Sequence, residues 1–308
     1  EFQRLGLSIV DEQHRFGVGQ RLALTRKGET VRGRIVPHQL NMSATPIPRT
    51  LAMTFFADLD VSVIDELPPG RTPVLTKLIS AARREQVIER VRDACAAGAQ
   101  AYWVCPLIEE SETLQLQTAI DTHAQLLAAC PELNVGLVHG RMKPDEKAAV
   151  MAGFVAGDTH LLVATTVIEV GVDVPNASLM VIEHAERFGL SQLHQLRGRV
   201  GRGSRESACV LLYEGPLSQT ARERLRVIHA YTDGFMIAAE DLKLRGPGEL
   251  LGTRQTGQPL LRFADLVIDE ALVELAREAA DTLLRDHVEA ADRHLARWLA
   301  GREELLKA

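Results

Sequence analysis

The chain has 308 residues, of which 46% are hydrophobic and 25% charged, so its composition is that of an ordinary globular protein with room for about two domains. Its net charge of −6 argues against a uniformly basic protein that coats nucleic acid, but it leaves room for a local basic groove. The four cysteines form no CxxC pair and no apolar run approaches the roughly 20 residues of a membrane span, which disfavours zinc, a redox dithiol and a membrane anchor, and favours a reducing cytoplasm.

Short strand-like runs alternate with helical patterns as far as residue 213. The first run starts almost at once, with no Met before it, and we therefore expect the sequence to be a piece of a longer protein. Strands that alternate with helices predict parallel sheets with helical crossovers, in which ligands gather at the carboxyl ends of the strands. The predicted strands cover residues 5–10, 39–43, 74–79, 102–106, 135–139, 160–165, 179–183 and 209–213, and the predicted helices between them cover residues 83–97, 116–129, 144–155 and 191–198.

The proline-rich stretch 67–73 interrupts this pattern, because closely spaced prolines exclude regular structure, and we predict an interdomain linker there. The alternation of strands and helices then stops after Tyr213. Residues 216–239 have a helical pattern, and residues 244–259 are rich in Gly and Pro, which predicts an ordered loop. Residues 269–300 have the apolar spacing of one amphipathic helix.

An apolar strand near the start delivers two carboxylates, Asp11 and Glu12, to its carboxyl end. Phosphoryl transfer from a nucleotide uses Mg²⁺, which a carboxylate holds, and a second carboxylate can polarise the attacking water. His14 follows closely, where it can sense the state of such a site. After the next strand, Ser43 and Thr45 supply hydroxyls for His14 or for a carboxylate across the sheet. Each segment alone is also typical of a simple turn that ends a strand.

A second group of polar residues follows the predicted strand 160–165. Thr165 and Thr166 end this strand, and a loop with Gly171 and Asp173 follows. Hydroxyls and backbone N–H groups in such a loop can hold DNA phosphates without reading sequence. The same pattern is also typical of a plain strand-to-helix turn.

Arginines and glycines gather in the segment 195–203. Arg199 and Arg202 offer planar, permanently charged forks that fit phosphate, and glycines let the backbone approach a ligand closely. An arginine supplied from a second domain can stabilise charge on a transferring phosphoryl group. The alternative is a basic surface patch without a ligand. No G-x-x-x-x-G-K-[ST] phosphate loop occurs in the sequence, so we expect this chain alone not to hydrolyse ATP at a useful rate.

Taken in order, four segments resemble motifs II, III, V and VI of superfamily 2 helicases. These segments are Asp11–His14, Ser43–Thr45, Thr165–Asp173 and Gln195–Arg202. Longer stretches resemble the RecG family of branched-DNA helicases, and they run from the start of the chain to about residue 268. The most specific are residues 11–18, 45–50, 64–71, 106–112, 188–197 and 241–252.

This resemblance implies an α/β fold, in which a partial RecA-like domain is followed by a complete RecA-like domain with ATP bound between them. The partial domain then covers residues 1–67 with motifs II and III, and the linker covers 68–73. The complete domain covers 74–214 with motifs IV to VI. A translocation hairpin, a loop and a C-terminal helix cover 215–308. The wedge domain and the phosphate loop of the family are absent from the sequence.

The resemblance also assigns roles to single residues. Asp11 holds Mg²⁺, Glu12 activates water, and His14 couples hydrolysis to DNA. Arg199 and Arg202 reach the γ-phosphate from the second domain. The residues expected at the nucleotide, its Mg²⁺ or the attacking water are Asp11, Glu12, His14, Ser43, Thr45, Gly171, Asp173, Gln195, Arg199 and Arg202. The residues expected to contact DNA or to couple hydrolysis to its movement are His139, Arg141, Thr165, Thr166, Arg245, Glu249 and Gln255.

The whole protein is therefore expected to be an ATP-dependent helicase or translocase that acts on branched double-stranded DNA at replication forks and Holliday junctions. We expect a cytoplasmic monomer that contacts no membrane, with single-strand DNA-binding protein as a further candidate partner. A transcription-repair coupling translocase is an alternative, although Gln13 and the stretch 108–112 favour the RecG family. A non-catalytic DNA-binding module is the other alternative, if the chain is natural at this length.

Overall fold

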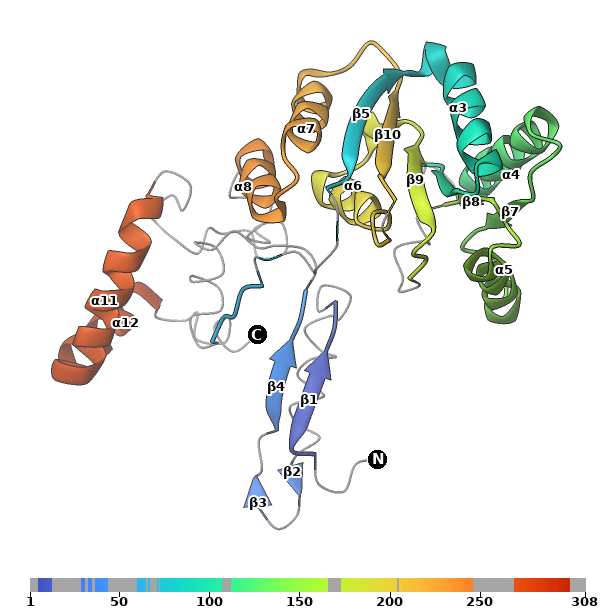
Figure 1. The fold of residues 1–308 in the computed structure, drawn as a ribbon. Helices are drawn as coiled ribbons and strands as arrows, with labels where there is room; N and C mark the ends of the chain where they lie inside the picture. The colour runs from blue at the N-terminus through green and yellow to red at the C-terminus, as the bar shows by residue number, and fades with distance from the viewer. Residues whose placement is uncertain are drawn as a thin grey trace. The chain divides into compact units, whose positions relative to one another are not determined.

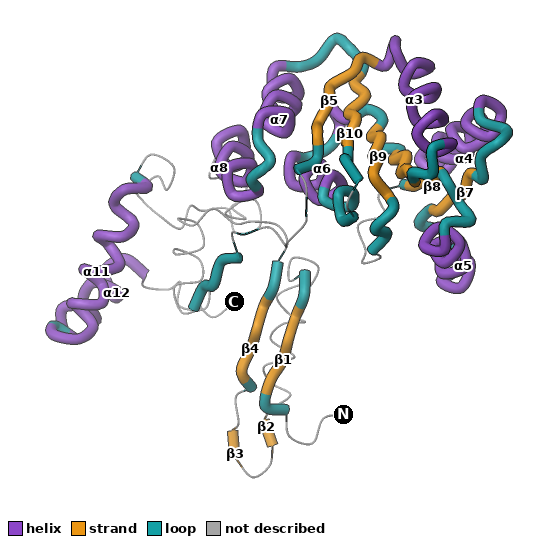
Figure 2. Tube along the Cα trace, in the orientation of Figure 1, coloured by secondary structure: helices purple, strands orange, loops and turns teal. Residues whose placement is uncertain are grey.

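The computed structural model describes the chain in segments, which are residues 5–12, 29–30, 33–34, 37–43, 60–64, 66, 71, 73–106, 112–165, 173–203, 205–245 and 269–299 (Figures 1 and 2). It divides into two compact units, one formed by Ser62–Arg245 and the other by Glu1–Val61 with Gly246–Ala308. None of the described helices is long and apolar enough to cross a membrane.

The unit Ser62–Arg245 is built on a six-stranded sheet in which all described pairings are parallel. The strands are β5 (Leu75–Ser80), β6 (Gln100–Val104), β7 (Val135–Val138), β8 (Leu161–Ala164), β9 (Ala177–Ile182) and β10 (Ala208–Tyr213), in the order β5-β10-β9-β6-β8-β7. Helices α3 (Arg84–Ala96), α4 (Glu112–Ala129), α5 (Pro144–Ala156) and α6 (Leu190–Arg197) connect them. The predicted parallel α/β fold is thus confirmed, with most element ends within about two residues of the expected ones.

Helices cover both faces of this sheet (Figure 2). Because neighbouring side chains of a strand point to opposite faces, Tyr102 and Trp103 of β6 belong to different core layers. Tyr102 packs with Phe154 of α5 and with residues of α6, whereas Trp103 lies with residues of α3 and α4. β6 and β8 are buried along their whole length, as central strands of a parallel sheet are.

Two further helices, α7 (Gln219–Ala230) and α8 (Gly234–Arg245), follow β10 and pack against α6. The sequence pattern predicted one helical stretch over 216–239. The structure breaks it at residues 231–233, because Asp233 Oδ1 accepts hydrogen bonds from the N–H groups of Phe235 and Met236 and so caps a new helix. α8 then continues to Arg245, where a loop was expected.

The described elements of the other unit are two pairs of strands and two helices. β1 (Leu7–Val10) and β4 (His38–Asn41) form a parallel pair, and β2 (Glu29–Thr30) and β3 (Gly33–Arg34) form a short antiparallel one. Leu7, Ile9 and Leu40 of the parallel pair are about half exposed. The single helix predicted over 269–300 is two helices, α11 (Glu270–Asp286) and α12 (Val288–Leu299), which are separated at His287.

Candidate nucleotide and DNA sites

Helix α6 runs from the carboxyl end of β9 back towards the amino end of that strand, and the arginine segment follows the helix there. Its apolar side chains, among them Leu193 and Leu196, are fully buried against the sheet. Beyond the helix, Gly203 packs so closely on Pro175, two residues before β9, that an added Cβ would overlap the Pro175 carbonyl oxygen. The sequence analysis placed ligands at the carboxyl ends of the strands, whereas the structure puts Arg199 and Arg202 at the opposite edge.

Arg202 is held in place by weak contacts on the surface of this edge. Its Nη1 lies 3.4 Å from Oδ1 of Asp173, and its Nε donates a hydrogen bond of 3.3 Å to the carbonyl of Gly198. The side chains of Arg202 and Asp173 are 32% and 62% exposed. An ion pair with this exposure contributes little free energy, so a phosphate can replace the carboxylate at small cost.

Arg199 lies near Arg202 and is half-buried. Burial raises the pKa of the Tyr102 hydroxyl to about 12. The positive charges of both guanidinium groups lower this pKa, but their effect is smaller than that of burial. Tyr102 therefore stays neutral beside two permanent positive charges. The two arginines and Asp173 thus form one charged cluster at the amino edge of the sheet.

The predicted segment Thr165–Asp173 begins at the other edge of the sheet and ends in this cluster. Thr165 follows β8 at the carboxyl edge, and Asp173 precedes β9 at the amino edge. The Thr165 side chain is buried, with 4% of the residue exposed, and its N–H donates to the carbonyl of Val138. The loop residues Thr166 and Gly171 lie outside the described residues. The predicted DNA-contacting and nucleotide-contacting ends of this motif therefore lie at opposite edges of one sheet.

Arg197, two residues before Arg199, is a buried structural residue and only 4% exposed. Burial lowers the pKa of its guanidinium, which nevertheless remains charged. Its hydrogen bonds run from Nη1 to the Ile228 carbonyl (2.8 Å), the Tyr231 carbonyl (2.9 Å) and the Thr76 hydroxyl (3.2 Å), and from Nη2 to Nδ1 of His194 (3.1 Å). One side chain therefore ties α6 to β5 and to the break between α7 and α8.

His194 and Arg71 complete the surroundings of this arginine. Burial, and after it the charges of Arg197 and Arg71, lower the pKa of His194 to about 4. The imidazole is therefore neutral at neutral pH and accepts a hydrogen bond from Arg197. Arg71 of the predicted linker donates a hydrogen bond of 3.1 Å to the Gly198 carbonyl. Gln195 lies on the same helix, half-buried and engaged with its neighbours.

Basic side chains follow β7 at the carboxyl edge. His139 directly follows this strand, and burial, together with the charges of Lys147 and Arg141, lowers its pKa. Lys147 Nζ donates to the Gly140 carbonyl at 2.8 Å, and α5 begins with Pro144. Backbone N–H groups at the start of a helix and nearby cations favour anions. The predicted DNA-contacting residues His139 and Arg141 therefore lie close to Lys147, and the acidic Asp145 and Glu146 follow in the first turn of α5.

The acidic pair lies in the other unit, at the carboxyl end of β1. Asp11 is exposed, and its Oδ1 accepts a hydrogen bond of 2.8 Å from the N–H of Glu12. Glu12 has a positive φ of 49°, an uncommon conformation for a residue other than glycine. Val10 and Asn41 are in register on the paired strands, which brings Asp11 and Ser43 to the same end of the pair.

Comparison with known proteins agrees with the motif order. The model for the helicase conserved C-terminal domain matches residues 82–204, and the model for ATP-dependent DNA helicase RecG, domain 3, C-terminal, matches residues 231–299. The chain is 60% identical over 309 residues to ATP-dependent DNA helicase RecG of Escherichia coli K12, covering all of this chain and 44% of that protein. The RecG of Haemophilus influenzae is 56% identical over 98% of this chain and 44% of its own length.

The chain belongs to the RecG family. It spans less than half of the length of these RecG relatives. A solved structure of RecG bound to a three-way DNA junction matches 89% of this chain and 34% of that chain, with 47% identity and a TM-score of 0.66. Dbp5 of S. cerevisiae bound to RNA and ADP BeF3 matches 75% of this chain and 58% of its own, with 16% identity and a TM-score of 0.51, which shows the fold alone.

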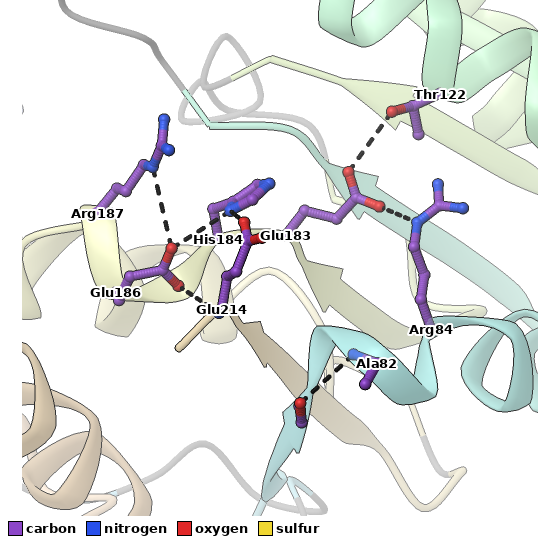
Figure 3. Close-up of polar contacts among 9 residues, drawn as sticks. Ala82, Arg84, Thr122, Glu183, His184, Glu186, Arg187 and Glu214 are labelled. Carbon is purple, nitrogen blue, oxygen red and sulfur yellow. Dashed lines mark hydrogen bonds and ion pairs between the residues drawn. The ribbon is translucent and has the colours of Figure 1, made fainter. Parts of the chain in front are cut away.

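The RecG-family sheet also carries a polar cluster that the sequence analysis missed (Figure 3). Glu183, buried at the end of β9, pairs with Arg84 Nε at 2.5 Å and accepts a 3.5 Å hydrogen bond from the Thr122 hydroxyl. His184, in a left-handed conformation, lies 3.3 Å from Glu186 and 3.4 Å from Glu214. A Glu-His pair directly after a buried strand was the only available signal, because the partners come from distant parts of the chain.

Several predicted site residues lie outside the described residues. These are His14, Thr45, Thr166, Gly171, Glu249 and Gln255. Arg245 is the last residue of α8. The roles of all predicted site residues in this RecG-family chain stay predictions.

Proposed function

We propose that this chain supplies the DNA-moving half of an ATP-driven motor for branched double-stranded DNA. The proposal rests mainly on the charged cluster of Arg199, Arg202 and Asp173 at the amino edge of the sheet, in which Arg202 and Asp173 are exposed. Its relatives are named ATP-dependent DNA helicase RecG, and one related structure holds a three-way DNA junction. Both observations support ATP and branched DNA as the substrates.

In this proposal, the arginines reach the γ-phosphate of ATP that is bound to the other RecA-like domain. The guanidinium of Arg202, which is exposed and only weakly paired with Asp173, can exchange this carboxylate for a phosphate. Charge that develops on the transferring phosphoryl group then strengthens the contact, and this is how an arginine lowers the barrier. The carboxylate of Asp173 keeps Arg202 oriented until the nucleotide arrives.

The chemistry of Asp11 and Glu12 fits a magnesium ion. The described residues contain no group of three or more His, Cys, Asp or Glu that would enclose a metal by themselves. Mg²⁺ is commonly held by one or two carboxylates together with phosphate oxygens and water. Asp11 is the exposed oxygen ligand for it. When bound, the ion neutralises phosphate charge, and Glu12 orients and deprotonates the attacking water.

Arg197 links the nucleotide site to the helix pair α7 and α8. It lies two residues from Arg199 and donates to carbonyls of α7 and of the break before α8. A movement of α6 when the arginines engage phosphate is therefore transmitted to these helices. The family resemblance gives this helical hairpin and the segment after it, with Arg245, Glu249 and Gln255, the role of moving duplex DNA.

DNA is expected at the carboxyl edge, near His139 and Arg141, where Arg141 and Lys147 supply positive charge. Contacts of this kind hold phosphates without reading base sequence. Binding by single-strand DNA-binding protein and a monomeric state are further predictions that rest on the family resemblance alone.

A hybrid protein tests this proposal directly. In it, this chain replaces the segment of E. coli RecG with which it aligns, and ATP hydrolysis is measured with forked and with linear duplex DNA of equal length. We expect hydrolysis that depends on DNA and is several-fold faster with the fork. A folded hybrid that hydrolyses ATP equally with and without DNA would refute the motor assignment, and equal rates on both DNAs would refute the preference for branches.

A further inference from the structure

None of the described helices covers one part of the six-stranded sheet. In the described part of this unit, α3 and α4 are the helices that pack on the face of the sheet with Trp103. They lie over the central and far strands, and between α3 and the strands β5, β10 and β9 a hollow of about 620 Å³ remains. Figure 1 labels α3 and the three strands that contribute its lining residues.

The floor and the inner wall of this hollow are aliphatic. Ile79, Leu179 and Val210 form the floor and are only partly buried, although they pack on the core below. Val87 and Val91 of α3 form the wall and are themselves buried. A half-buried aliphatic surface remains in contact with water, and an apolar partner that covers it gains free energy by removing this contact.

The rim of the hollow is mainly cationic, in a chain whose net charge is −6. Lys77 lies on β5, and Arg83 and Arg90 lie at the start and in the second turn of α3, with Glu89 as the single acidic rim residue. Arg83 Nε donates to Gln86, an uncharged partner. In the described part of the chain, neither Lys77 nor Arg90 has an ion-pair partner, so this positive charge is available to a ligand.

We propose that this groove binds an acidic peptide segment of another protein through an apolar anchor residue. The aliphatic floor takes the anchor, and carboxylates on either side of it pair with Lys77, Arg83 and Arg90. Nucleic acid fits less well, because the floor offers neither aromatic rings for base stacking nor polar groups for sugars. The groove is separate from the arginine cluster and from the basic turn after β7.

The test uses the whole chain and three labelled peptides. The first has two leucines flanked on each side by four glutamates, the second replaces the leucines by serines, and the third replaces the glutamates by lysines. Fluorescence anisotropy measures binding, and hydrogen exchange with mass spectrometry locates it. We expect the glutamate–leucine peptide to bind and to protect the segments of β5 and α3. The serine and the lysine peptides should bind at least about tenfold more weakly.

Charge reversal supplies the matched control. The double variant Arg83→Glu, Arg90→Glu should weaken binding of the first peptide about tenfold or more, because two attractions become repulsions. Arg222→Glu with Arg226→Glu makes the same charge change on exposed positions of α7, against the other face of the sheet, and should change affinity less than about twofold.

Three results would overturn the proposal. The first is an equal loss of peptide affinity in both double variants, and the second is protection from hydrogen exchange outside β5 and α3. The third is protection of β5 and α3 by an oligothymidine when the glutamate–leucine peptide gives none, which would make the groove a nucleic-acid site. If the double variant loses its folded circular dichroism, Lys77→Glu on the exposed side of β5 replaces it. The comparison of the three peptides on the unmodified chain needs no variant, and equal binding of all three would refute the proposal by itself.

Discussion

Replacing Arg197 by methionine removes the buried guanidinium that joins α6, β5 and the α7–α8 break, with similar side-chain length. The Ile228 carbonyl then loses its partner in a buried place, which costs about 1–3 kcal/mol. The bond to Tyr231 is only partly buried, so water replaces part of it. We therefore expect the free energy of unfolding of this unit to fall by about 2–4 kcal/mol.

The assay is equilibrium urea unfolding followed by the fluorescence of Trp103. The chain has two tryptophans, and Trp103 is fully buried in the sheet, so a Trp298→Phe background reports on this unit alone. Arg197→Lys should give an intermediate loss, because one ammonium cannot reach all the acceptors at once. Arg222→Met, an exposed arginine of α7, is the control. A loss below about 1 kcal/mol for Arg197→Met, equal to the control, would refute this account of the buried arginine.

Three further predictions concern the same sites. The pKa of His194 in the folded chain is about 4, below the ordinary value of 6.5, so His194 takes up its proton in the unfolded chain first as the pH falls. The free energy of unfolding should therefore fall by up to about 3 kcal/mol between pH 6.5 and pH 4. Urea unfolding at each pH should show a smaller dependence of this free energy on pH for His194→Gln. Gly203→Ala should lower the free energy of unfolding by about 2 kcal/mol or more, because the backbone must move to make room for the Cβ. At Gly215 an added Cβ meets nothing within 4 Å, so Gly215→Ala should lower it by less than about 1 kcal/mol. Equal losses for the two variants would show that the close approach of Gly203 to Pro175 is unimportant. In the hybrid protein, Glu12→Gln should abolish ATP turnover and leave binding of a fluorescent ATP analogue intact, and near-normal turnover would exclude Glu12 as the group that activates water.

The parallel sheet could be predicted from the sequence because its signals are local. Buried strands such as β6 and β8 are continuous apolar runs, and each is followed by a helical pattern. Helix breaks were harder, because residues 219–230 and 234–245 both have helix-forming sequences and only three residues separate them. The break is set by one capping carboxylate, Asp233, which a periodicity argument does not weigh against continuation of the helix.

The candidate site could be predicted only in part. The motif residues Arg199, Arg202 and Asp173 are recognisable by their spacing, and the structure brings Arg202 and Asp173 together. The role of Arg197 depends on carbonyls that lie 31 and 34 residues later in the chain, and the Glu183–Arg84 pair joins residues 99 apart. Contacts over such separations are decided by how α3, α6 and α7 pack, and no local pattern encodes them.

The central claim is that Arg202 acts on the phosphate of ATP. Its most direct test is the steady-state kcat for ATP hydrolysis by the hybrid protein with forked DNA, measured for Arg202→Ala and for Arg205→Ala. Arg205 is a neighbouring exposed arginine that donates to the Ala97 carbonyl. The account predicts a fall of roughly 10³-fold or more for Arg202→Ala and a small change for Arg205→Ala. A fall of less than about tenfold for Arg202→Ala, with the hybrid still folded, would contradict it.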